Sequence, residues 1–372
     1  MEKTILHVSK YYYPDLGGIE TLARSLAEGL TTYRNVVVCF ATDGKTSCDT
    51  INGVIVHRVK VNFSFMHQDV SFGYYKQLKR LIQEYKPDFV HVHCPNPYVY
   101  PLVLRAISPK MKLILHWHSD IISKGLMYKM VKPLENKALK RSDLILATSP
   151  NYIHPSSPIY EYKDKIQIVQ NGVIAEDFDM KEGDIERITS IKHQYGDKPL
   201  IIFVGRHIPY KGIDLLIEAE KHIQQDCHII ITGTGPLSSQ LEKLSKSPRI
   251  TFTGRLSSDD LRCHVYASDI FAFPSNTKAE AFGIALAEAM YCHCVPVVFH
   301  LEGSGVNWVS LKDQTGLEIA HGDTRAFASA IDHLLTHKEL LTKYAQASHE
   351  RIKENFTDKM AVMKMNEIYN SL

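Results

Sequence analysis

The chain has 372 residues, of which 44% are hydrophobic and 23% are charged, and its formal net charge is only +2. This length exceeds the usual size of one hydrophobic core, so we expect two domains. No apolar run approaches the roughly 18 residues of a membrane-spanning helix, and the start, MEKTILHVSKYYYP, has no signal-peptide pattern, which excludes membrane-spanning and secreted classes. Seven scattered cysteines without a disulfide framework indicate a reducing cytoplasm.

The charge is distributed unevenly along the chain. Residues 1–172 carry 22 Lys and Arg against 14 Asp and Glu, a charge of +8, whereas residues 173–372 carry 21 against 27, a charge of −6. A basic first part favours an anionic membrane surface or an anionic substrate. We do not expect nucleic acid as a partner, because no recognised binding motif accompanies the charge.

The first half alternates apolar strands with helical patterns. A strand at residues 4–8 precedes a loop with Gly17 and Gly18 and a helix from about Glu20 to Leu30. Further strands are expected at residues 36–42, 54–59, 89–93 and 112–116, with a helix at 71–85. This alternation predicts a parallel, doubly wound sheet that binds ligands at the carboxyl ends of its strands. The glycine loop before a helix suits an anion, although a tight turn alone would also need glycine.

Two histidine clusters fall at such strand ends, HVHCPNPY (91–98) and HWHSD (116–120). His91 and His116 lie within strands, where histidines are often core residues. His118 follows its strand and is the better candidate for a ligand contact, with Asp120 as a possible orienting group.

A basic helical pattern follows at residues 121–141. Apolar residues alternate there with Lys124, Lys129, Lys132, Lys137, Lys140 and Arg141. The pattern fits an amphipathic surface on acidic lipid and fits a solvated helix face equally well. Lys76, Lys79 and Arg80 would extend the same basic surface.

The first domain is expected to close with a strand near residues 165–173, which ends in Asn171–Gly172–Val173. The polar and charged stretch that follows predicts a linker containing a helix. We therefore expect domains at residues 1–173 and 198–355, a linker at 174–197, and a C-terminal helix at 356–372 that packs back on the first domain.

In the second half, PLIIFVGRHIPYKG (199–212) places Arg206 at a strand end and Lys211 at a helix start, where two cations could face one diphosphate. Surface salt bridges are the simpler alternative. The next strand runs into Gly233 and Gly235, but Ser238 replaces the third glycine of a dinucleotide fingerprint. Another strand ends at Gly254–Arg255.

The stretch EAFGIALAE contains two glutamates, Glu280 before a helix and Glu288 inside it. Their spacing corresponds to roughly 12 Å along a helix axis. That exceeds the roughly 5–10 Å of a glycosidase carboxylate pair, so the two could instead hold the ends of one polyhydroxylated ligand. Gly283 at the helix start would let backbone N–H groups approach an anion.

The motifs GGIE, His118, NGV, GR…YKG, GTGP, EAFGIALAE and Thr315–Gly316 occur in an order that resembles the retaining nucleotide-sugar glycosyltransferases of family 4, of the bacterial surface-polysaccharide type. The resemblance implies an α/β fold of the GT-B type, in which two Rossmann-like doubly wound domains face a cleft. The first domain would receive the acceptor and the second would bind the donor.

The resemblance also implies roles for individual residues. The catalytic set would be His118 and Glu280 at the donor sugar, with Arg206 and Lys211 at the departing diphosphate. The donor-binding set would be Gly17, Gly18, Gly233, Gly235, Arg255, Phe282, Gly283, Ile284 and Glu288, the last at the nucleotide ribose. No divalent metal or other cofactor is expected, and neither Asp177–Phe178–Asp179 nor Cys292 and Cys294 is expected to bind a metal.

The expected reaction is transfer of a sugar, with retention of configuration, from a nucleotide-sugar to a hydroxyl group. The donor would be a UDP-hexose or UDP-N-acetylhexosamine, and the acceptor a polyprenyl-diphosphate-linked sugar of O-antigen or capsule synthesis. The enzyme would then be peripheral on the inner face of the cytoplasmic membrane. The alternatives are a soluble sugar acceptor, or a nucleotide-sugar epimerase of the same architecture.

Overall fold

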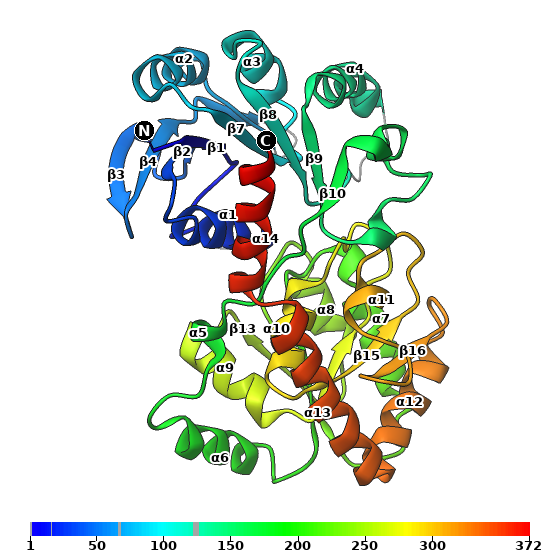
Figure 1. Ribbon diagram of the computed structural model, residues 1–372. Helices are drawn as coiled ribbons and strands as arrows, with labels where there is room; N and C mark the ends of the chain where they lie inside the picture. Colours follow the sequence, from blue (N-terminus) through cyan, green and yellow to red (C-terminus); the bar gives the residue numbers. More distant parts are fainter. Residues whose placement is uncertain (1, 16, 66–67, 122–125) are drawn as a thin grey trace. The chain divides into compact units, whose positions relative to one another are not determined.

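The computed structural model describes residues 2–15, 17–65, 68–121 and 126–372 (Figure 1). By their contacts, the residues divide into unit 1, Met1–Asn171 with Asp358–Leu372, and unit 2, Gly172–Thr357. Each unit contains one large, mainly parallel sheet.

Unit 1 has an eight-stranded sheet in the order β10-β9-β8-β7-β1-β2-β4-β3, in which only β3 and β4 pair antiparallel. Its strands are β1 (Thr4–Val8), β2 (Arg34–Ala41), β3 (Ser47–Ile51), β4 (Val54–Lys60), β7 (Phe89–Cys94), β8 (Lys112–Trp117), β9 (Leu144–Ala147) and β10 (Ile166–Ile168). A separate hairpin pairs β5 (Phe63–Phe65) with β6 (Gln68–Val70).

Helices cover both faces of this sheet (Figure 1). They are α1 (Gly18–Gly29), α2 (Tyr74–Tyr85), α3 (Val99–Ala106), α4 (Leu126–Arg141) and α14 (Asp358–Ser371), with short 3-10 helices η1 (Pro150–Tyr152) and η2 (Pro158–Lys165). α14 belongs here because Ala361, Met365, Ile368 and Tyr369 form one buried stripe that packs with α1 and the sheet.

Unit 2 has a six-stranded parallel sheet in the order β13-β12-β11-β14-β15-β16. Its strands are β11 (Leu200–Val204), β12 (His228–Thr232), β13 (Ile250–Gly254), β14 (Ile270–Phe273), β15 (Val295–Phe299) and β16 (Leu317–Ile319). Its helices are α5 (Ala175–Phe178), α6 (Asp184–Gln194), η3 (Pro209–Lys211), α7 (Ile213–Glu220), α8 (Ser238–Leu244), α9 (Ser258–Ala267), α10 (Ile284–Tyr291), α11 (Val306–Val309), α12 (Thr324–Thr336) and α13 (Lys338–Asn355).

Residues 174–197, expected as a linker with a helix, contain α5 and α6, which pack on α9 within unit 2. A buried ion pair joins α6 to α9. The Arg262 guanidinium on α9 donates to both carboxylate oxygens of Asp184 on α6, at 2.8 and 3.0 Å. This segment is therefore built into unit 2.

The predicted α/β class with two parallel sheets is confirmed. Helix boundaries differ by a few residues, since α1 starts at Gly18 rather than Glu20, and α10 starts at Ile284, which leaves Phe282 outside it. Lys124 of the predicted basic helix lies outside the described residues. None of the helices in the described ranges has the length and apolar character that crossing a membrane requires.

Candidate functional site

Most predicted donor residues lie at one edge of the unit 2 sheet. The adjacent strands β13, β12, β11 and β14 are parallel, and β11 and β12 end level, with Val204 opposite Thr232. The loops at their carboxyl ends carry, in chain order, Arg206, Lys211, Gly233, Gly235, Arg255 and Glu280. In open parallel sheets this edge is where ligands bind.

Lys211 and Glu280 meet at this edge. The Lys211 ammonium donates to Oε2 of Glu280, which also accepts a hydrogen bond from the Ser275 hydroxyl at 3.0 Å. The side chains of Lys211 and Glu280 are only 12% and 10% exposed. Burial alone would lower the pKa of Lys211, but the Glu280 carboxylate raises that pKa above its ordinary value, so Lys211 is a fixed cation at neutral pH.

A second loop holds the backbone of Glu280. The Ser304 hydroxyl donates to the Glu280 carbonyl oxygen, and the Gly305 N–H donates to the Ala281 carbonyl oxygen at 2.9 Å. Ser275 and Ser304 were not predicted as site residues. A serine inside each loop is too weak a sequence signal to indicate that both converge on one glutamate.

Glu288 lies on the first turns of α10 and is half-buried. Burial raises its pKa to about 8, the negative charge of Asp177 adds to this shift, and Lys211 opposes it. Gly283, with a φ of +84°, occupies the left-handed region directly before the helix. The short helix therefore starts at a position that favours glycine.

Phe282, predicted to bind the donor, has a buried side chain. Its ring is 2% exposed and packs edge-on against Trp308 and Phe356, with centroids 6.4 and 5.7 Å away. Its side chain thus anchors the loop in the hydrophobic core. Ile284, also predicted to bind the donor, is half-buried as the first residue of α10.

The glycine turn after β12 lies against the loop after β11. A Cβ on Gly233, whose φ is +115°, would lie 2.0 Å from the Gly205 carbonyl oxygen, and one on Gly235 would lie 2.5 Å from the His207 carbonyl oxygen. The two loops therefore pack backbone on backbone. Arg206 and Arg255 at this edge are exposed.

In unit 1, Gly17 and Gly18 are exposed, and Gly18 begins α1 after the loop that follows β1. His118 directly follows β8 and is 5% exposed. It belongs to a buried group with His7, His91, His93 and His116.

These five histidines form two hydrogen-bonded series. In the first, His7 Nε2 bonds Asn35 Oδ1 (3.2 Å), His93 Nε2 bonds His7 Nδ1 (3.5 Å) and His118 Nε2 bonds His93 Nδ1 (3.0 Å). In the second, His91 bonds the Tyr369 hydroxyl (2.6 Å) and His116 (3.2 Å). Nitrogens of His91, His93 and His116 lie within 4.8 Å of one another, as a metal site would require. The hydrogen bonds already use both nitrogens of His91 and His93.

Asp120 does not orient His118 as expected. Its Oδ1 accepts hydrogen bonds from Trp117 Nε1 at 2.9 Å and from the Ser157 hydroxyl at 3.0 Å, and its N–H donates to the Tyr152 hydroxyl at 2.6 Å. His118 shares its hydrogen bond with His93 instead. Asp120 thus ties the end of β8 to the segment around η1 and η2.

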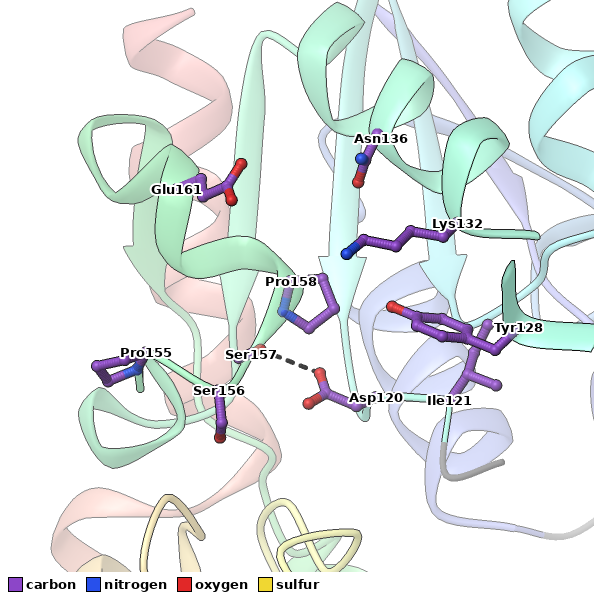
Figure 2. A pocket seen from close by; sticks show the side chains of 10 residues that line it. All are labelled: Asp120, Ile121, Tyr128, Lys132, Asn136, Pro155, Ser156, Ser157, Pro158 and Glu161. Atoms are coloured by element: carbon purple, nitrogen blue, oxygen red, sulfur yellow. Dashed lines mark hydrogen bonds between the residues drawn. The ribbon is translucent and has the colours of Figure 1, made fainter. Parts of the chain in front are cut away.

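Asp120 also lines a polar cavity of about 320 Å³ within unit 1 (Figure 2). Lys132, Asn136 and Asp120 point toward the same space, with Tyr128 and Glu161 at its sides (Figure 2). The sequence does not predict this cavity. Its walls come from α4 and η2, and the basic pattern at residues 121–141 gives no sign that α4 packs next to η2.

The cysteine and histidine run at residues 292–294 has structural roles. The Cys294 thiol is buried and donates to the carbonyl oxygens of Val265 and Ser268, at 3.1 and 3.3 Å. The His293 ring points away and stacks on His349, with centroids 4.1 Å apart.

Comparison with known proteins identifies the family. The profile described as Glycosyltransferase Family 4 matches residues 16–177, and the profile described as Glycosyl transferases group 1 matches residues 184–351. The chain belongs to glycosyltransferase family 4. It is a transferase of the GT-B architecture, as the motif resemblance implied.

Similar proteins match over nearly their whole length. The O-antigen chain mannosyltransferase C of Escherichia coli is 29% identical, covering 99% of this chain and 98% of that protein. D-rhamnosyltransferase WbpZ of Pseudomonas aeruginosa is 27% identical, covering 95% and 92%.

Two solved structures show the same fold. Sucrose-phosphate synthase from Thermosynechococcus elongatus has a TM-score of 0.80 at 16% identity, covering 99% of each chain. Anabaena HepE in complex with UDP has a TM-score of 0.77 at 18% identity, covering 99% of this chain and all of that one.

Proposed function

We propose that this family 4 glycosyltransferase moves a sugar, with retention of configuration, from a nucleotide-sugar to a hydroxyl of a lipid-diphosphate-linked sugar during surface-polysaccharide synthesis. The observation that carries the proposal is the edge of the unit 2 sheet, where the Lys211–Glu280 pair lies among loops that also hold Arg206 and two glycine turns. The names of the O-antigen mannosyltransferase and the D-rhamnosyltransferase support a polysaccharide product.

The leaving group determines what this edge must do. Breaking the bond between sugar and diphosphate places negative charge on the diphosphate, and fixed cations lower the barrier to this step. Lys211 is held in place by Glu280, whereas the exposed guanidinium of Arg206 can close on the phosphates in a bidentate manner. The two cations would thus act in place of a divalent metal.

The glutamates are assigned to the two ends of the donor. Within the described residues, the side-chain contacts to the Glu280 carboxylate fall on Oε2, so Oε1 is the atom for a hydroxyl of the donor sugar. Glu288, about one turn along α10, is assigned to the ribose hydroxyls. No side chain at this edge is assigned as a nucleophile. We propose instead that the acceptor attacks on the face from which the diphosphate leaves and passes its proton to that phosphate.

The acceptor assignment rests on the surface of unit 1. Lys76, Lys79 and Arg80 on α2 are exposed, as are Lys129, Lys132, Lys137 and Lys140 on α4. Phe72, two residues before α2, is 77% exposed, and its ring lies 6.1 Å from that of Phe63 on the exposed strand β5. Basic and aromatic side chains together favour an anionic membrane surface, where a lipid-linked acceptor resides. A soluble acceptor is the alternative.

Thermal unfolding in EDTA tests the donor site, with UDP, GDP or ADP added separately. UDP is our expected base, and GDP is included because one relative is named a GDP-mannose-dependent mannosyltransferase. A diphosphate at a hundred times its Kd should stabilise the protein by about 2.7 kcal/mol. Glu288→Ala should lose most of this shift, and Glu339→Ala, an exposed change on α13, should keep it. If no diphosphate or intact nucleotide-sugar raises the midpoint, the proposed site is wrong.

The stereochemistry needs a separate measurement. Slow hydrolysis of the donor, followed by ¹H NMR before the released sugar mutarotates, reports the anomer that forms first. Retention requires the same anomeric configuration in the donor and in the released sugar. Release of the opposite anomer, or a glycosyl group trapped on a side chain, would rule out the same-face mechanism.

A further inference from the structure

Four of the five histidines in the two series, His7, His91, His93 and His116, share one face of the unit 1 sheet, and His118 directly follows β8. His7 lies on β1, His91 and His93 two residues apart on β7, and the register places His7 opposite His91 and His93 opposite His116. All are buried. Burial lowers the pKa of His7 to about 4 and of His118 to about 3, and holds the pKa of His93 well below its ordinary value. The rings are therefore neutral at pH 7, and each carries one N–H and one bare nitrogen.

The direction of the first series follows from Asn35. Its Nδ2 donates to the carbonyl oxygens of Leu30 and Tyr33, at 2.9 and 3.0 Å. These two bonds fix the orientation of the amide, so Oδ1 must be the atom that faces His7 and must accept a hydrogen bond. His7 consequently carries its proton on Nε2.

The remaining tautomers follow one from another. Because His7 is neutral, its Nδ1 is bare and accepts from His93 Nε2–H. His93 Nδ1 is then bare and accepts from His118 Nε2–H. His118 is left with a lone pair on Nδ1. That atom is buried and has no hydrogen-bond partner among the described residues.

A buried acceptor without a partner costs about 1–3 kcal/mol, so it calls for an explanation. We propose that Asn35, His7 and His93 are positioning residues that fix the tautomer of His118, so that its Nδ1 accepts a hydrogen bond from a hydroxyl of the bound donor sugar. The identity of the donated group rests on the proposed function. The tautomer follows from unit 1 alone.

The second series provides a matched control. His91 is as buried as His7, lies on the same face of the sheet, and bonds Tyr369 and His116 rather than any member of the first series. His7→Leu and His91→Leu remove the same atoms from equivalent environments. Only His7→Leu removes the acceptor that sets the direction of the hydrogen bonds to His118.

The tautomer can be read in the full-length protein without any substrate. ¹⁵N-histidine NMR, with His118 assigned by loss of its signals in His118→Gln, should show Nε2 protonated and Nδ1 unprotonated. In His7→Leu, the tautomer of His118 that is protonated at Nδ1 should appear. In His91→Leu, His118 should keep the wild-type tautomer. Wild-type protein with His118 protonated at Nδ1 would overturn the proposal, and that reading requires only the assignment variant His118→Gln to fold.

Donor analogues test the ligand part, with UDP-glucose and GDP-mannose as probes and a deoxyfluoro group replacing one hydroxyl at a time. Fluorine cannot donate a hydrogen bond, so at one position kcat/KM for donor hydrolysis should fall about tenfold in wild type. His7→Leu should show a smaller loss at that position, because Nδ1–H can donate to fluorine, and His91→Leu should match wild type. Equal tolerance of fluorine at every position would overturn the ligand assignment. Failure of both donors to bind would instead count against the proposed function.

A metal ion bound by three of these histidines is incompatible with the proposed hydrogen bonds. Zn²⁺ bound by His91, His93 and His116 would occupy a lone pair, and the series requires His93 Nδ1 to accept from His118. Elemental analysis should find no stoichiometric metal, and added Zn²⁺ should leave the His93 signals unchanged. One tightly bound equivalent that shifts them would overturn the proposal.

Discussion

The ammonium of Lys211, after β11, contacts the carboxylate of Glu280, after the adjacent strand β14. The two residues lie 69 positions apart in sequence, and their side chains are only 12% and 10% exposed. The pair places a permanent cation at the carboxyl edge of the unit 2 sheet. Glu280 also holds that cation in place, so the stability of the unit depends on a residue that we propose acts in catalysis.

Replacement of Lys211 should therefore lower both the rate of sugar transfer and the stability of the protein. Lys211→Met removes one cation from the leaving diphosphate and should lower kcat about 100-fold or more. It also leaves the Glu280 carboxylate buried and unpaired, which should lower the free energy of unfolding by about 3–5 kcal/mol. Lys221→Met, which removes an exposed cation paired with Glu218, is the control and should change neither. A stable Lys211→Met enzyme with wild-type kcat would contradict the role of the pair.

Glu288 should make stability depend on pH. Its pKa is about 8 in the folded protein, against 4.5 for an ordinary glutamate. Between these values the folded state holds a proton that the unfolded chain has lost, so the free energy of unfolding should fall as the pH rises through this window. Denaturant titrations of wild type and Glu288→Gln at several pH values should show that the variant removes this part of the slope.

The same group should control nucleotide affinity. Only the ionised Glu288 can accept hydrogen bonds from ribose hydroxyls on both oxygens, so diphosphate binding should tighten between pH 7 and 9. Calorimetric Kd values for the responding diphosphate, measured in that range, check this. The tightening should be absent in Glu288→Gln, and a variant with unchanged pH dependence would show that another group titrates.

The turn after β12 should not tolerate a side chain. Gly233→Ala places a methyl group 2.0 Å from the Gly205 carbonyl oxygen at a φ of +115°. We therefore expect the free energy of unfolding to fall by about 3 kcal/mol or more. Gly322→Ala in the same unit has a φ of +77° and open space around it, and should cost only about 1 kcal/mol. Chemical unfolding of both variants separates the close approach from the backbone strain. Equal losses would mean that the loops can move apart.

The basic surface of unit 1 should bind anionic vesicles. Each basic residue near such a surface contributes about 1 kcal/mol, so Lys76→Glu, Lys79→Glu and Arg80→Glu combined should weaken cosedimentation about 100-fold at low salt. The same charge change at Lys338, Lys343 and Lys353, all exposed on α13, is the control. If wild type fails to sediment with anionic vesicles at low salt, the membrane assignment fails and the soluble acceptor is favoured.

The fold class could be predicted because strands buried in parallel sheets appear as short runs of apolar residues, such as 200–204 and 295–299. Glycines and charged residues at the ends of those runs indicated where the edge of the sheet lies. The contact between Lys211 and Glu280 could not be predicted, because it depends on β14 lying next to β11 rather than next to β13.

Other features required the packing as well. Phe282 belongs to a motif that suggests donor contact, yet its ring fills the core, and periodicity alone does not separate these two roles. His293 adopts a φ of +66°, in the left-handed region that favours glycine. The first histidine series could not be predicted from the sequence. His7 and Asn35 become neighbours of His93 only because β1 lies between β7 and β2 in the sheet.

The position of α14 sets the order in which the chain can fold during synthesis. Ile5, Phe89 and Ile114 of unit 1 pack against residues after position 357, and all of unit 2 lies between these segments in the sequence. At about 5–20 residues per second, the ribosome needs roughly 10–40 s to make the intervening segment. Unit 2 can thus complete its core while the earlier unit still waits for the helix whose Tyr369 bonds His91. A chaperone that shields this open face of the nascent chain would act on the part of the protein made first.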